Sequence, residues 1–136
     1  MPDGKQLVQR MFEEVINARN VGLIDEVFDP AFVSHTAQGD LDREGFRAFV
    51  NGWIAAFPDL HCEISQMVSE GDRVSWTIRA TGTMKGEFNG MPPSGKQMDF
   101  LSMNHGIFRG DKAQEHWVVM DMITMLTQLG FMPPQG

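Results

Sequence analysis

Residues 73–83 read RVSWTIRATGT, and apolar and polar side chains alternate along this stretch as far as Thr81. In an extended strand, neighbouring side chains point to opposite faces of the sheet. One face therefore carries the apolar side chains Val74, Trp76, Ile78 and Ala80. The other face carries the polar side chains Arg73, Ser75, Thr77, Arg79 and Thr81. The pattern predicts a strand that covers a hydrophobic core on one face and forms the convex side of a sheet on the other.

Further strands are expected on both sides of this stretch. Residues 60–68 precede it, and Glu70-Gly71-Asp72 forms the turn between the two. Residues 96–109 and 114–121 follow as two more strands, which join near Gly110-Asp111. These four strands run in sequence and predict an antiparallel sheet in the second half of the chain.

The first half has helical rather than alternating periodicity. The expected helices cover residues 3–20, 23–28 and 42–57 before the strands and 122–129 after them. Asp3 is the expected N-cap of the first helix, and Pro58 ends the third. A short extended piece is expected at 32–36. Helices followed by antiparallel strands predict an α+β domain with helices packed on one face of a curved sheet.

The composition indicates one domain and excludes some classes of binding partner. The 136 residues suit a single domain over 1–136, and an apolar content of 42% predicts a folded core. A net charge of −7 repels phosphate groups, so no nucleic-acid partner is expected. Cys62 is the single cysteine, which excludes an internal disulfide and fits a reducing compartment. No signal-like or membrane-length apolar run is present, which predicts a cytoplasmic protein with no membrane partner.

Several short motifs follow one another in the second half. They are Phe57-Pro58-Asp59-Leu60, Glu70-Gly71-Asp72-Arg73-Val74, Thr81-Gly82-Thr83, the run from Gly86 to Lys96, Glu115-His116-Trp117, Asp121 and Gln128-Leu129-Gly130. In this order the set closely resembles SnoaL-like polyketide cyclases, also called ester cyclases, of the nuclear transport factor 2-like superfamily. The resemblance covers most of the chain and is strongest from Phe57 onward. It is specific for the family and far less specific for the substrate, because one fold hosts many functions.

The resemblance implies a cone-shaped, curved antiparallel sheet with three N-terminal helices packed on its concave face. It also implies a pocket in the mouth of the cone and a homodimer or larger assembly. Characterised cyclases of this family close a ring by intramolecular aldol condensation, without a metal, a cofactor or a Schiff base. Their acid/base group is an aspartate on the last strand, and the position that matches it here is Asp121.

Asp121 has two interpretations. It shares one strand face with Glu115, Trp117 and Val119, and a carboxylate beside such apolar groups would have a raised pKa and could accept a proton from carbon. It also directly precedes the expected tail helix, where aspartate is favoured as an N-cap. The family resemblance favours the pocket.

His105 is the second catalytic candidate, and its position depends on the hairpin around Gly110-Asp111. An odd-numbered loop puts His105 on the face of Asp121, whereas an even-numbered loop puts Asn104 there, because a slip of one residue exchanges the faces. The family has Asp-Gly-Lys at this turn, where this chain has Gly110-Asp111-Lys112. The strand histidine of the family therefore matches His105 only approximately.

The candidate substrate-binding residues are one histidine and a set of aromatic side chains. Related sequences often carry a pocket histidine at the position of His35, although a solvent-exposed loop histidine is the alternative. Trp53, Phe57, Phe88, Phe100 and Trp117 could form the wall of a pocket for an aromatic ligand. The same aromatic side chains could equally form ordinary core.

No other motif in the sequence predicts a different kind of catalytic or binding site. Residues 90–96 match the start of a phosphate-binding loop, but Gln97 replaces the required Ser or Thr and two prolines remove amide donors. The four histidines lack zinc-ligand spacing, so no metal is expected. His61 and Cys62 are strand neighbours and point to opposite faces, which disfavours a Cys–His nucleophile. The chain has no tyrosine, so it lacks the oxyanion-hole tyrosine of ketosteroid isomerases.

These observations predict a cofactor-independent enzyme of the polyketide cyclase type. Asp121 would remove a proton alpha to a carbonyl of a β-keto ester or polyphenolic substrate, and His105 and His35 would hydrogen-bond the enolate oxygen. The apolar wall would fold the hydrophobic substrate so that its reacting carbons meet. The alternatives are an isomerase, dehydratase or epoxide hydrolase on the same scaffold, or a non-enzymatic protein that binds a hydrophobic small molecule.

Overall fold

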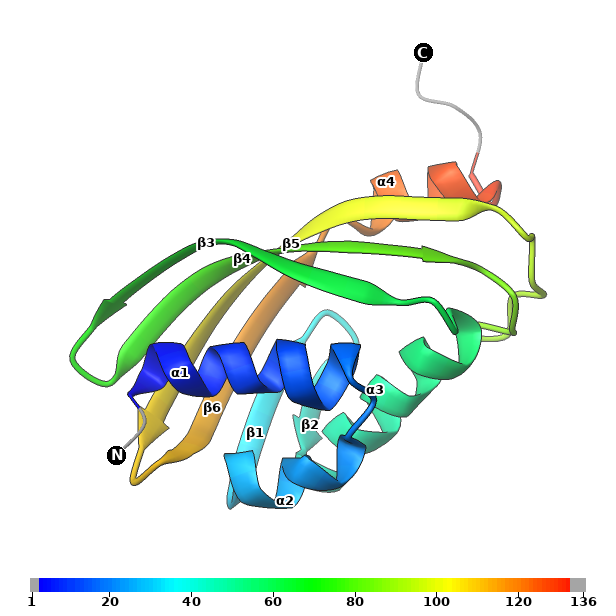
Figure 1. The fold of residues 1–136 in the computed structure, drawn as a ribbon. Coiled ribbons are helices and arrows are strands. Elements are labelled where there is room, and N and C mark those ends of the chain that lie inside the picture. The colour runs from blue at the N-terminus through cyan, green and yellow to red at the C-terminus, as the bar shows by residue number, and fades with distance from the viewer. Residues whose placement is uncertain (1–2, 133–136) are drawn as a thin grey trace.

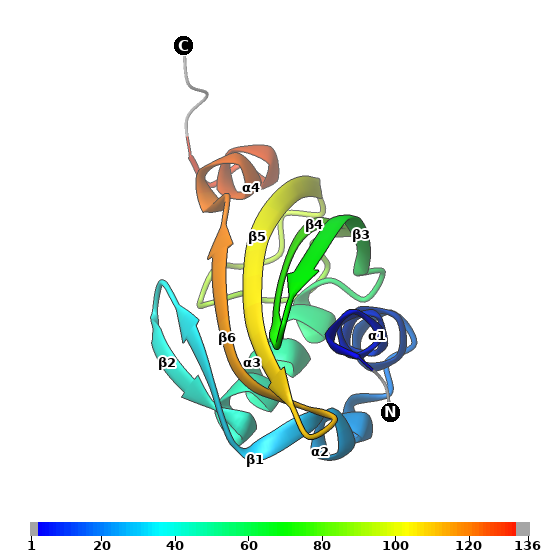
Figure 2. The ribbon, with the colours of Figure 1, turned by 90° about the vertical axis from the view of Figure 1, so that its left-hand side faces the viewer.

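A curved, six-stranded sheet is the central element of the computed structural model, which describes residues 3–132. The strands are β1 (Phe28–Thr36), β2 (Gly39–Asp42), β3 (His61–Glu70), β4 (Arg73–Thr83), β5 (Gln97–Arg109) and β6 (Lys112–Met120). They lie in the order β2-β1-β6-β5-β4-β3. All neighbouring pairs are antiparallel except β1 and β6, which run parallel. The sheet bends around its concave face (Figures 1 and 2).

Helices cover the concave face of the sheet and one of its ends. α1 (Gly4–Gln9) continues into the π-helical segment η1 (Arg10–Asn17), and η2 (Val21–Leu23) continues into α2 (Ile24–Val27). Together with α3 (Arg43–Ala56), these segments lie on the concave side, whereas α4 (Met122–Leu129) lies at the far end beside β5 (Figure 1). The α+β cone with N-terminal helices on its concave face is thus confirmed, with α4 as an addition at the end of the sheet. No helix in residues 3–132 is long and apolar enough to cross a membrane.

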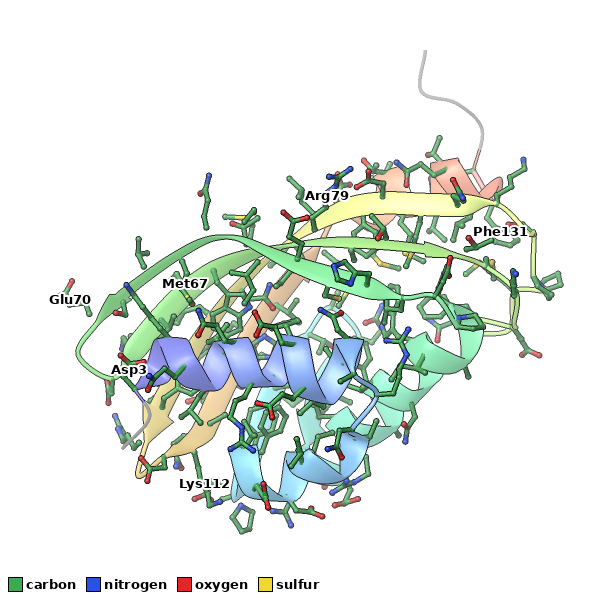
Figure 3. All side chains as sticks on the ribbon, in the orientation of Figure 1. Asp3, Met67, Glu70, Arg79, Lys112 and Phe131 are labelled. Atoms are coloured by element: carbon green, nitrogen blue, oxygen red, sulfur yellow. The ribbon has the colours of Figure 1, made fainter. Side chains whose placement is uncertain are left out.

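β4 has the two faces that its alternation predicts. Its apolar side chains Val74, Trp76, Ile78 and Ala80 are all buried in the core. Arg79 lies on the opposite, convex side, away from α1 (Figure 3). The space between the sheet and the helices is filled by apolar side chains, among which Phe28, Phe32 and Phe57 are completely buried.

The hairpin of β1 and β2 and the parallel pairing of β1 with β6 differ from the sequence expectation, which had only a short extended piece at 32–36 and an antiparallel sheet. The parallel pair brings Ser34 next to His116 and His35 next to Trp117. These contacts join segments about eighty residues apart. Local periodicity carries no information on such a pairing, because it depends on where the whole chain returns.

Local capping follows the sequence closely. The Asp3 side chain accepts a hydrogen bond from the backbone N–H of Gln6, and the Gln6 side chain accepts one from the N–H of Asp3. This reciprocal capping box confirms Asp3 as the N-cap of α1. The helical stretch ends at Asn17 rather than at residue 20, and Arg19 follows in the left-handed region with φ 63°.

Two side-chain amides close exposed strand edges. The amide of Asn17 donates to Cys62 O and accepts from Cys62 N on the edge strand β3, both at 2.8 Å. The amide of Gln128 makes the same pair of bonds with Asp99 of β5, at 2.7 and 2.9 Å, beyond the end of β6. Each amide therefore substitutes for a neighbouring strand.

The loop motifs of the second half have structural roles. The Asp59 carboxylate accepts hydrogen bonds from the backbone N–H and the hydroxyl of Thr83, at 2.7 and 2.8 Å, which joins two of the motifs. These bonds lower the pKa of Asp59. A Cβ atom at Gly86 would lie 2.6 Å from Ala55 O, so only glycine fits where this loop passes the end of α3.

Candidate functional site

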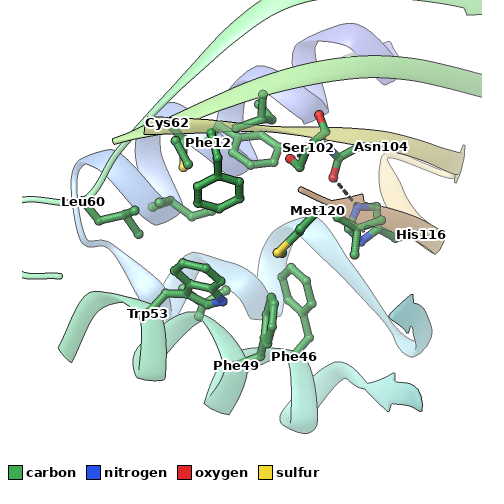
Figure 4. A pocket seen from close by; sticks show the side chains of 16 residues that line it. Phe12, Phe46, Phe49, Trp53, Leu60, Cys62, Ser102, Asn104, His116 and Met120 are labelled. Carbon is green, nitrogen blue, oxygen red and sulfur yellow. Dashed lines mark hydrogen bonds between the residues drawn. The ribbon is translucent and has the colours of Figure 1, made fainter. Parts of the chain in front are cut away.

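A cavity of about 70 Å³ lies between the concave face of the sheet and the helices (Figure 4). We call it the inner cavity. Its apolar walls come from η1, α3, three strands and the loop before β3: Phe12, Ile16, Phe46, Phe49, Val50, Trp53, Leu60, Ile78, Ala80, Phe100, Val118 and Met120. The other residues that line it are Cys62, Ser102, Asn104 and His116. The lining residues thus place a small polar group at one end of an otherwise apolar space.

Four buried side chains at that end form a continuous hydrogen-bonded network, which we call the buried polar network. Ser34 Oγ lies 2.9 Å from His116 Nδ1, and His116 Nε2 lies 2.9 Å from Asn104 Oδ1. The Asn104 amide nitrogen donates to Ser102 Oγ at 3.1 Å and approaches Ser102 O at 3.4 Å. All four residues are more than nine-tenths buried. Such a network is stable in an apolar surrounding because its members satisfy one another.

The imidazole of His116 is neutral. Burial, together with a smaller effect from the charge of His35, lowers its pKa to about 3. Because Asn104 Oδ1 can only accept, the Nε2 atom of the neutral ring carries the proton and Nδ1 accepts from the Ser34 hydroxyl. The ring of Trp76 lies almost parallel to the imidazole, with centroids 5.6 Å apart, and Phe46 meets it edge-on at 5.9 Å. His116 is therefore held rigidly by hydrogen bonds in its plane and by aromatic contacts around it.

A second space of about 320 Å³, the outer chamber, adjoins the inner cavity. Phe49, Trp53, Val118 and Met120 line both spaces and form the threshold between them. Polar and aromatic side chains from the β1–β2 hairpin, the loop at Phe88 and β6 make up most of the remaining wall. The inner cavity, at whose end the buried polar network lies, and the outer chamber thus share one wall.

His35 lies at the outer chamber but has no free ring nitrogen. Its Nδ1 atom donates to Asp40 at 2.8 Å and its Nε2 atom to Glu115 at 2.5 Å. The hydrogen bonds to Glu115 and then Asp40 raise the pKa of His35, which favours the imidazolium. The indole of Trp117 stacks on this ring with centroids 5.1 Å apart. His35 is thus a charged member of the chamber wall and not an available base.

Asp121 does not face the inner cavity. It is the N-cap of α4, and its exposed carboxylate accepts from the backbone N–H of Thr124 at 3.2 Å and from the Thr124 hydroxyl at 2.7 Å. These bonds lower the pKa of Asp121, the side-chain bond most. The expectation of a half-buried carboxylate with a raised pKa is therefore wrong, because the strand ends at Met120 and the chain turns into α4.

His105 lies on the convex face of the sheet, away from the inner cavity. The turn at Gly110-Asp111 has two residues, but a bulge at Gln114 shifts the register so that His105 pairs with Trp117 and Asn104 with Val118. The His105 ring bonds to Ser75 Oγ at 2.6 Å and Arg73 at 3.2 Å. His105 therefore lies on the same face of the sheet as Trp117, as expected for an odd-numbered loop. That face is the convex one and does not line the inner cavity.

The aromatic candidates divide into three groups. Trp53 and Phe100 line the inner cavity, and Trp53, Phe88 and Trp117 line the outer chamber. Phe57 lines neither space, because it is fully buried behind Trp53, with which it stacks at 5.6 Å.

The sequence pattern did not identify His116, and it placed Asn104 at the site only as an alternative. Both belong to the strand faces that carry Met98, Phe100 and Val118, which are buried. Asn104 pairs with Trp76 on the apolar face of β4, which places the even-numbered residues of β5 on the inner face of the sheet. The opposite face of β6 was expected to be the inner one because it carries Trp117.

Titratable groups are scarce in the inner cavity. Cys62 and His116 are the titratable side chains among the residues that line it. Burial raises the pKa of the Cys62 thiol to about 12, so the thiol stays protonated. Within residues 3–132, no set of three or more His, Cys, Asp or Glu side chains is placed to hold a metal ion. His116 is therefore the titratable side chain lining this cavity that is held in the unprotonated form of a base.

Comparison with solved structures identifies close relatives of this architecture. IdmH of Streptomyces antibioticus, a proposed polyketide cyclase, is 29% identical with a TM-score of 0.82, over 93% of this chain and 97% of that one. AclR of Streptomyces galilaeus, a proposed hydroxylase, is 29% identical with a TM-score of 0.87, over 97% and 87% of the two chains. A proposed SnoaL-like polyketide cyclase of Jannaschia sp. CCS1 is 26% identical with a TM-score of 0.86, over 96% and 92%. No protein of curated function gave a match.

The family model for SnoaL-like polyketide cyclases matches residues 6–129. This range includes every helix and strand that lines the inner cavity and the outer chamber. The chain therefore belongs to the SnoaL-like polyketide cyclase family.

Proposed function

We propose that the protein is a cofactor-independent enzyme that moves a proton at a carbon next to a carbonyl and thereby closes a ring in an apolar, polyketide-like substrate. The observation that carries this proposal is the buried polar network at the end of an apolar cavity, with His116 as its titratable member. Membership of the polyketide cyclase family supports a small-molecule carbonyl substrate.

His116 is the proposed proton carrier. It is neutral before the reaction, which is the state a base requires, and its basic nitrogen Nδ1 becomes available to a substrate once the Ser34 hydroxyl that donates to it rotates away. A low pKa in the empty cavity makes it a weak base there, but a developing enolate would place a negative charge beside the new imidazolium. The nearly parallel ring of Trp76 would stabilise that cation further.

Asn104 is the proposed partner of the substrate oxygen. Its amide nitrogen carries two hydrogens, and the second contact, to Ser102 O at 3.4 Å, is too long for a strong bond. A substrate carbonyl could replace this contact and receive a hydrogen bond as its oxygen becomes negative. Asn104 would then contact both the oxygen and the base.

Ring closure needs no other reactant. His116 takes the proton from the carbon alpha to one carbonyl and leaves an enolate. The enolate carbon attacks a second carbonyl of the same molecule, and a carbon–carbon bond forms while that oxygen becomes an alkoxide. The alkoxide takes the proton back from His116, so the imidazole returns to its neutral form. Close apolar walls favour this step because they hold the reacting carbons near each other.

A non-enzymatic carrier of an apolar molecule is the second candidate. The observation that favours it is that the polar atoms of the buried polar network bond mainly to one another. A ligand in the inner cavity would then meet an almost entirely apolar surface, as in a simple binding protein.

Deuterium exchange separates the two candidates. Ethyl benzoylacetate in D₂O exchanges its C2 hydrogens through the enolate, and proton NMR follows the loss of their signal. We expect wild-type protein to accelerate exchange above the buffer rate, and His116→Gln to lose about 100-fold or more of that acceleration. Glutamine can still bond to Ser34 and Asn104 but cannot carry the proton.

His105→Gln is the matched control, because it makes the same change on the convex face, and it should exchange at the wild-type rate. Equal rates in wild-type protein and His116→Gln would contradict the proposed role of His116. Binding of the ester with no acceleration by wild-type protein would favour the carrier. Product analysis with a diketone substrate tests ring closure itself.

A further inference from the structure

Trp53 carries a hydrogen-bond donor that has no acceptor among the described residues. Its side chain is 7% exposed, and its indole nitrogen is shielded from solvent without a partner within residues 3–132. Buried indole N–H groups in proteins usually find an acceptor, and an unsatisfied one costs about 1–3 kcal/mol. Trp76 is also a buried indole without an acceptor among the described residues, but only Trp53 of the two lines the inner cavity and the outer chamber, where a ligand can supply the acceptor.

The indole lies at the threshold between the two spaces. Trp53 lines both the inner cavity and the outer chamber, and it packs against Phe57, Phe88 and Phe100 with centroids 4.6–5.9 Å apart. The edge of the indole that carries the nitrogen lies toward Phe49 (Figure 4), whose ring meets it at 74° with centroids 6.2 Å apart. An aromatic ring is only a weak acceptor, so a carbonyl oxygen would be preferred.

The volumes limit what can occupy this place. The inner cavity, at about 70 Å³, is smaller than the roughly 150 Å³ that holds one benzene ring. A ring must therefore extend across the threshold into the outer chamber, whose volume is about 320 Å³. Met120 lines both spaces, and its flexible side chain can move to widen the passage.

We propose that Trp53 is a specificity-determining residue that binds aryl ketones, with the aromatic ring across the threshold and the ketone oxygen on the indole N–H. This inference deepens the proposed function, on which it rests, because it names the substrate class of the same cavity. It gives the substrate a polar contact on α3, in addition to the buried polar network on β1, β5 and β6.

Acetophenone and α-methylstyrene are suitable probes. The two molecules have nearly the same shape, but acetophenone has a carbonyl oxygen where α-methylstyrene has a methylene group. A difference in their affinities therefore measures the effect of the hydrogen-bond acceptor. Binding is measured by calorimetry, and the indole N–H signals of the three tryptophans are followed by ¹H–¹⁵N NMR and assigned with single Trp→Phe variants. We expect acetophenone to shift the Trp53 N–H signal downfield and α-methylstyrene to leave it nearly unchanged.

Two variants test the donor. Trp53→Phe keeps an aromatic ring but removes the N–H, and should weaken acetophenone binding about three- to tenfold with little change for α-methylstyrene. Trp76→Phe is the matched control, because Trp76 is also a buried indole without an acceptor in the described residues and does not line either space. Because the Trp76 ring also packs against His116, the readout of this control is selectivity, and the ratio of the affinities for the two probes should stay unchanged.

Three results would overturn the proposal. They are an equal loss of affinity for both probes in Trp53→Phe, a Trp53 N–H signal that acetophenone does not move, and the absence of binding by both probes. These measurements need no turnover. A wild-type protein that binds acetophenone through Trp53 but does not accelerate deuterium exchange would contradict the proposed function and leave the ketone site supported.

Discussion

His116 and Asp121 lie five residues apart and have opposite surroundings. His116 is 4% exposed and its charge is suppressed by burial, whereas Asp121 is exposed and its charge is stabilised by Thr124. A group that is neutral only because it is buried can change its charge when a ligand changes its surroundings. A carboxylate with a lowered pKa on the surface is a poor acceptor for a proton from carbon. Residue chemistry therefore favours His116 over Asp121 for the proposed proton transfer.

Burial of His116 predicts a specific dependence of stability on pH. Its folded pKa of about 3 lies below the unfolded value of 6.5, so the unfolded state binds more protons between these two values. The neutral imidazole of His116 therefore makes its full contribution to the free energy of unfolding above pH 6.5, and this contribution is lost as the pH falls toward 3. The slope is at most about 1.4 kcal/mol per pH unit.

Urea unfolding of wild-type protein and His116→Gln measures this contribution. Between pH 7.5 and pH 5, wild-type protein should lose roughly 2 kcal/mol more than the variant. His35 has a raised pKa and contributes in the opposite direction, but it is present in both proteins and cancels in the difference. Parallel pH profiles for the two proteins would contradict the burial of a neutral imidazole.

The sequence predicts single-residue roles well where they depend on neighbours along the chain. Asp3 as a helix cap and the two faces of β4 follow from local spacing and are confirmed. The role of His116 does not follow in this way, because it needs the bulge at Gln114 and the parallel pairing with β1. The N-cap interpretation of Asp121 was also local, and it describes the geometry correctly.

At the scale of elements, the strand edges are stabilised by side chains rather than by further strands. Asn17 binds both backbone groups of Cys62 on β3, in a partly buried position. Gln128 binds both backbone groups of Asp99 on β5, in an exposed position. Because Cys62 lines the inner cavity, the first of these contacts also fixes one wall of the site.

Removal of either amide should destabilise the fold. We expect Asn17→Ala to cost about 1–3 kcal/mol, because it leaves partly buried backbone groups unpaired, and Gln128→Ala to cost less, because water replaces its bonds. Urea unfolding measures both, with Gln38→Ala, on the exposed β1–β2 turn, as the control. Losses no larger than that of the control would show that the amides do not stabilise these edges.

The sequence predicts the elements of the second half better than those of the first. Strict alternation identifies β4, and the turns at 70–72 and 110–111 locate its neighbours. The hairpin of β1 and β2 was missed because its second strand, Gly39–Asp42, is short and mostly exposed, without an apolar pattern. That hairpin forms part of the outer chamber, so the chamber could not be derived from periodicity.

At the scale of the whole molecule, the convex face of the sheet carries an apolar patch. Leu101, Met103 and Val119 are 50%, 62% and 72% exposed there, next to the polar face of β4. Exposed apolar patches of this kind often mark contacts with another molecule. The expected homodimer would cover this face by a symmetric contact. Both the homodimer and the cytoplasmic location remain predictions.

Charge on this patch should prevent assembly. We expect wild-type protein to sediment as a dimer at micromolar concentration and Met103→Glu to shift it toward the monomer, because two copies of the new charge would be buried together. Ala48→Glu, on the exposed side of α3, should leave the dimer intact. A wild-type monomer, or an equal effect of both variants, would contradict a dimer through the convex face.

The central claim is that proton transfer takes place inside the cone, at His116, and not at its rim, at Asp121. The measurement that tests it most directly is the rate of C2 deuterium exchange of ethyl benzoylacetate with His116→Gln and Asp121→Asn side by side. Asparagine caps a helix about as well as aspartate, so Asp121→Asn should keep both its melting temperature and its rate. We expect a loss of about 100-fold or more in His116→Gln alone. A loss in Asp121→Asn with an unchanged rate in His116→Gln would contradict it.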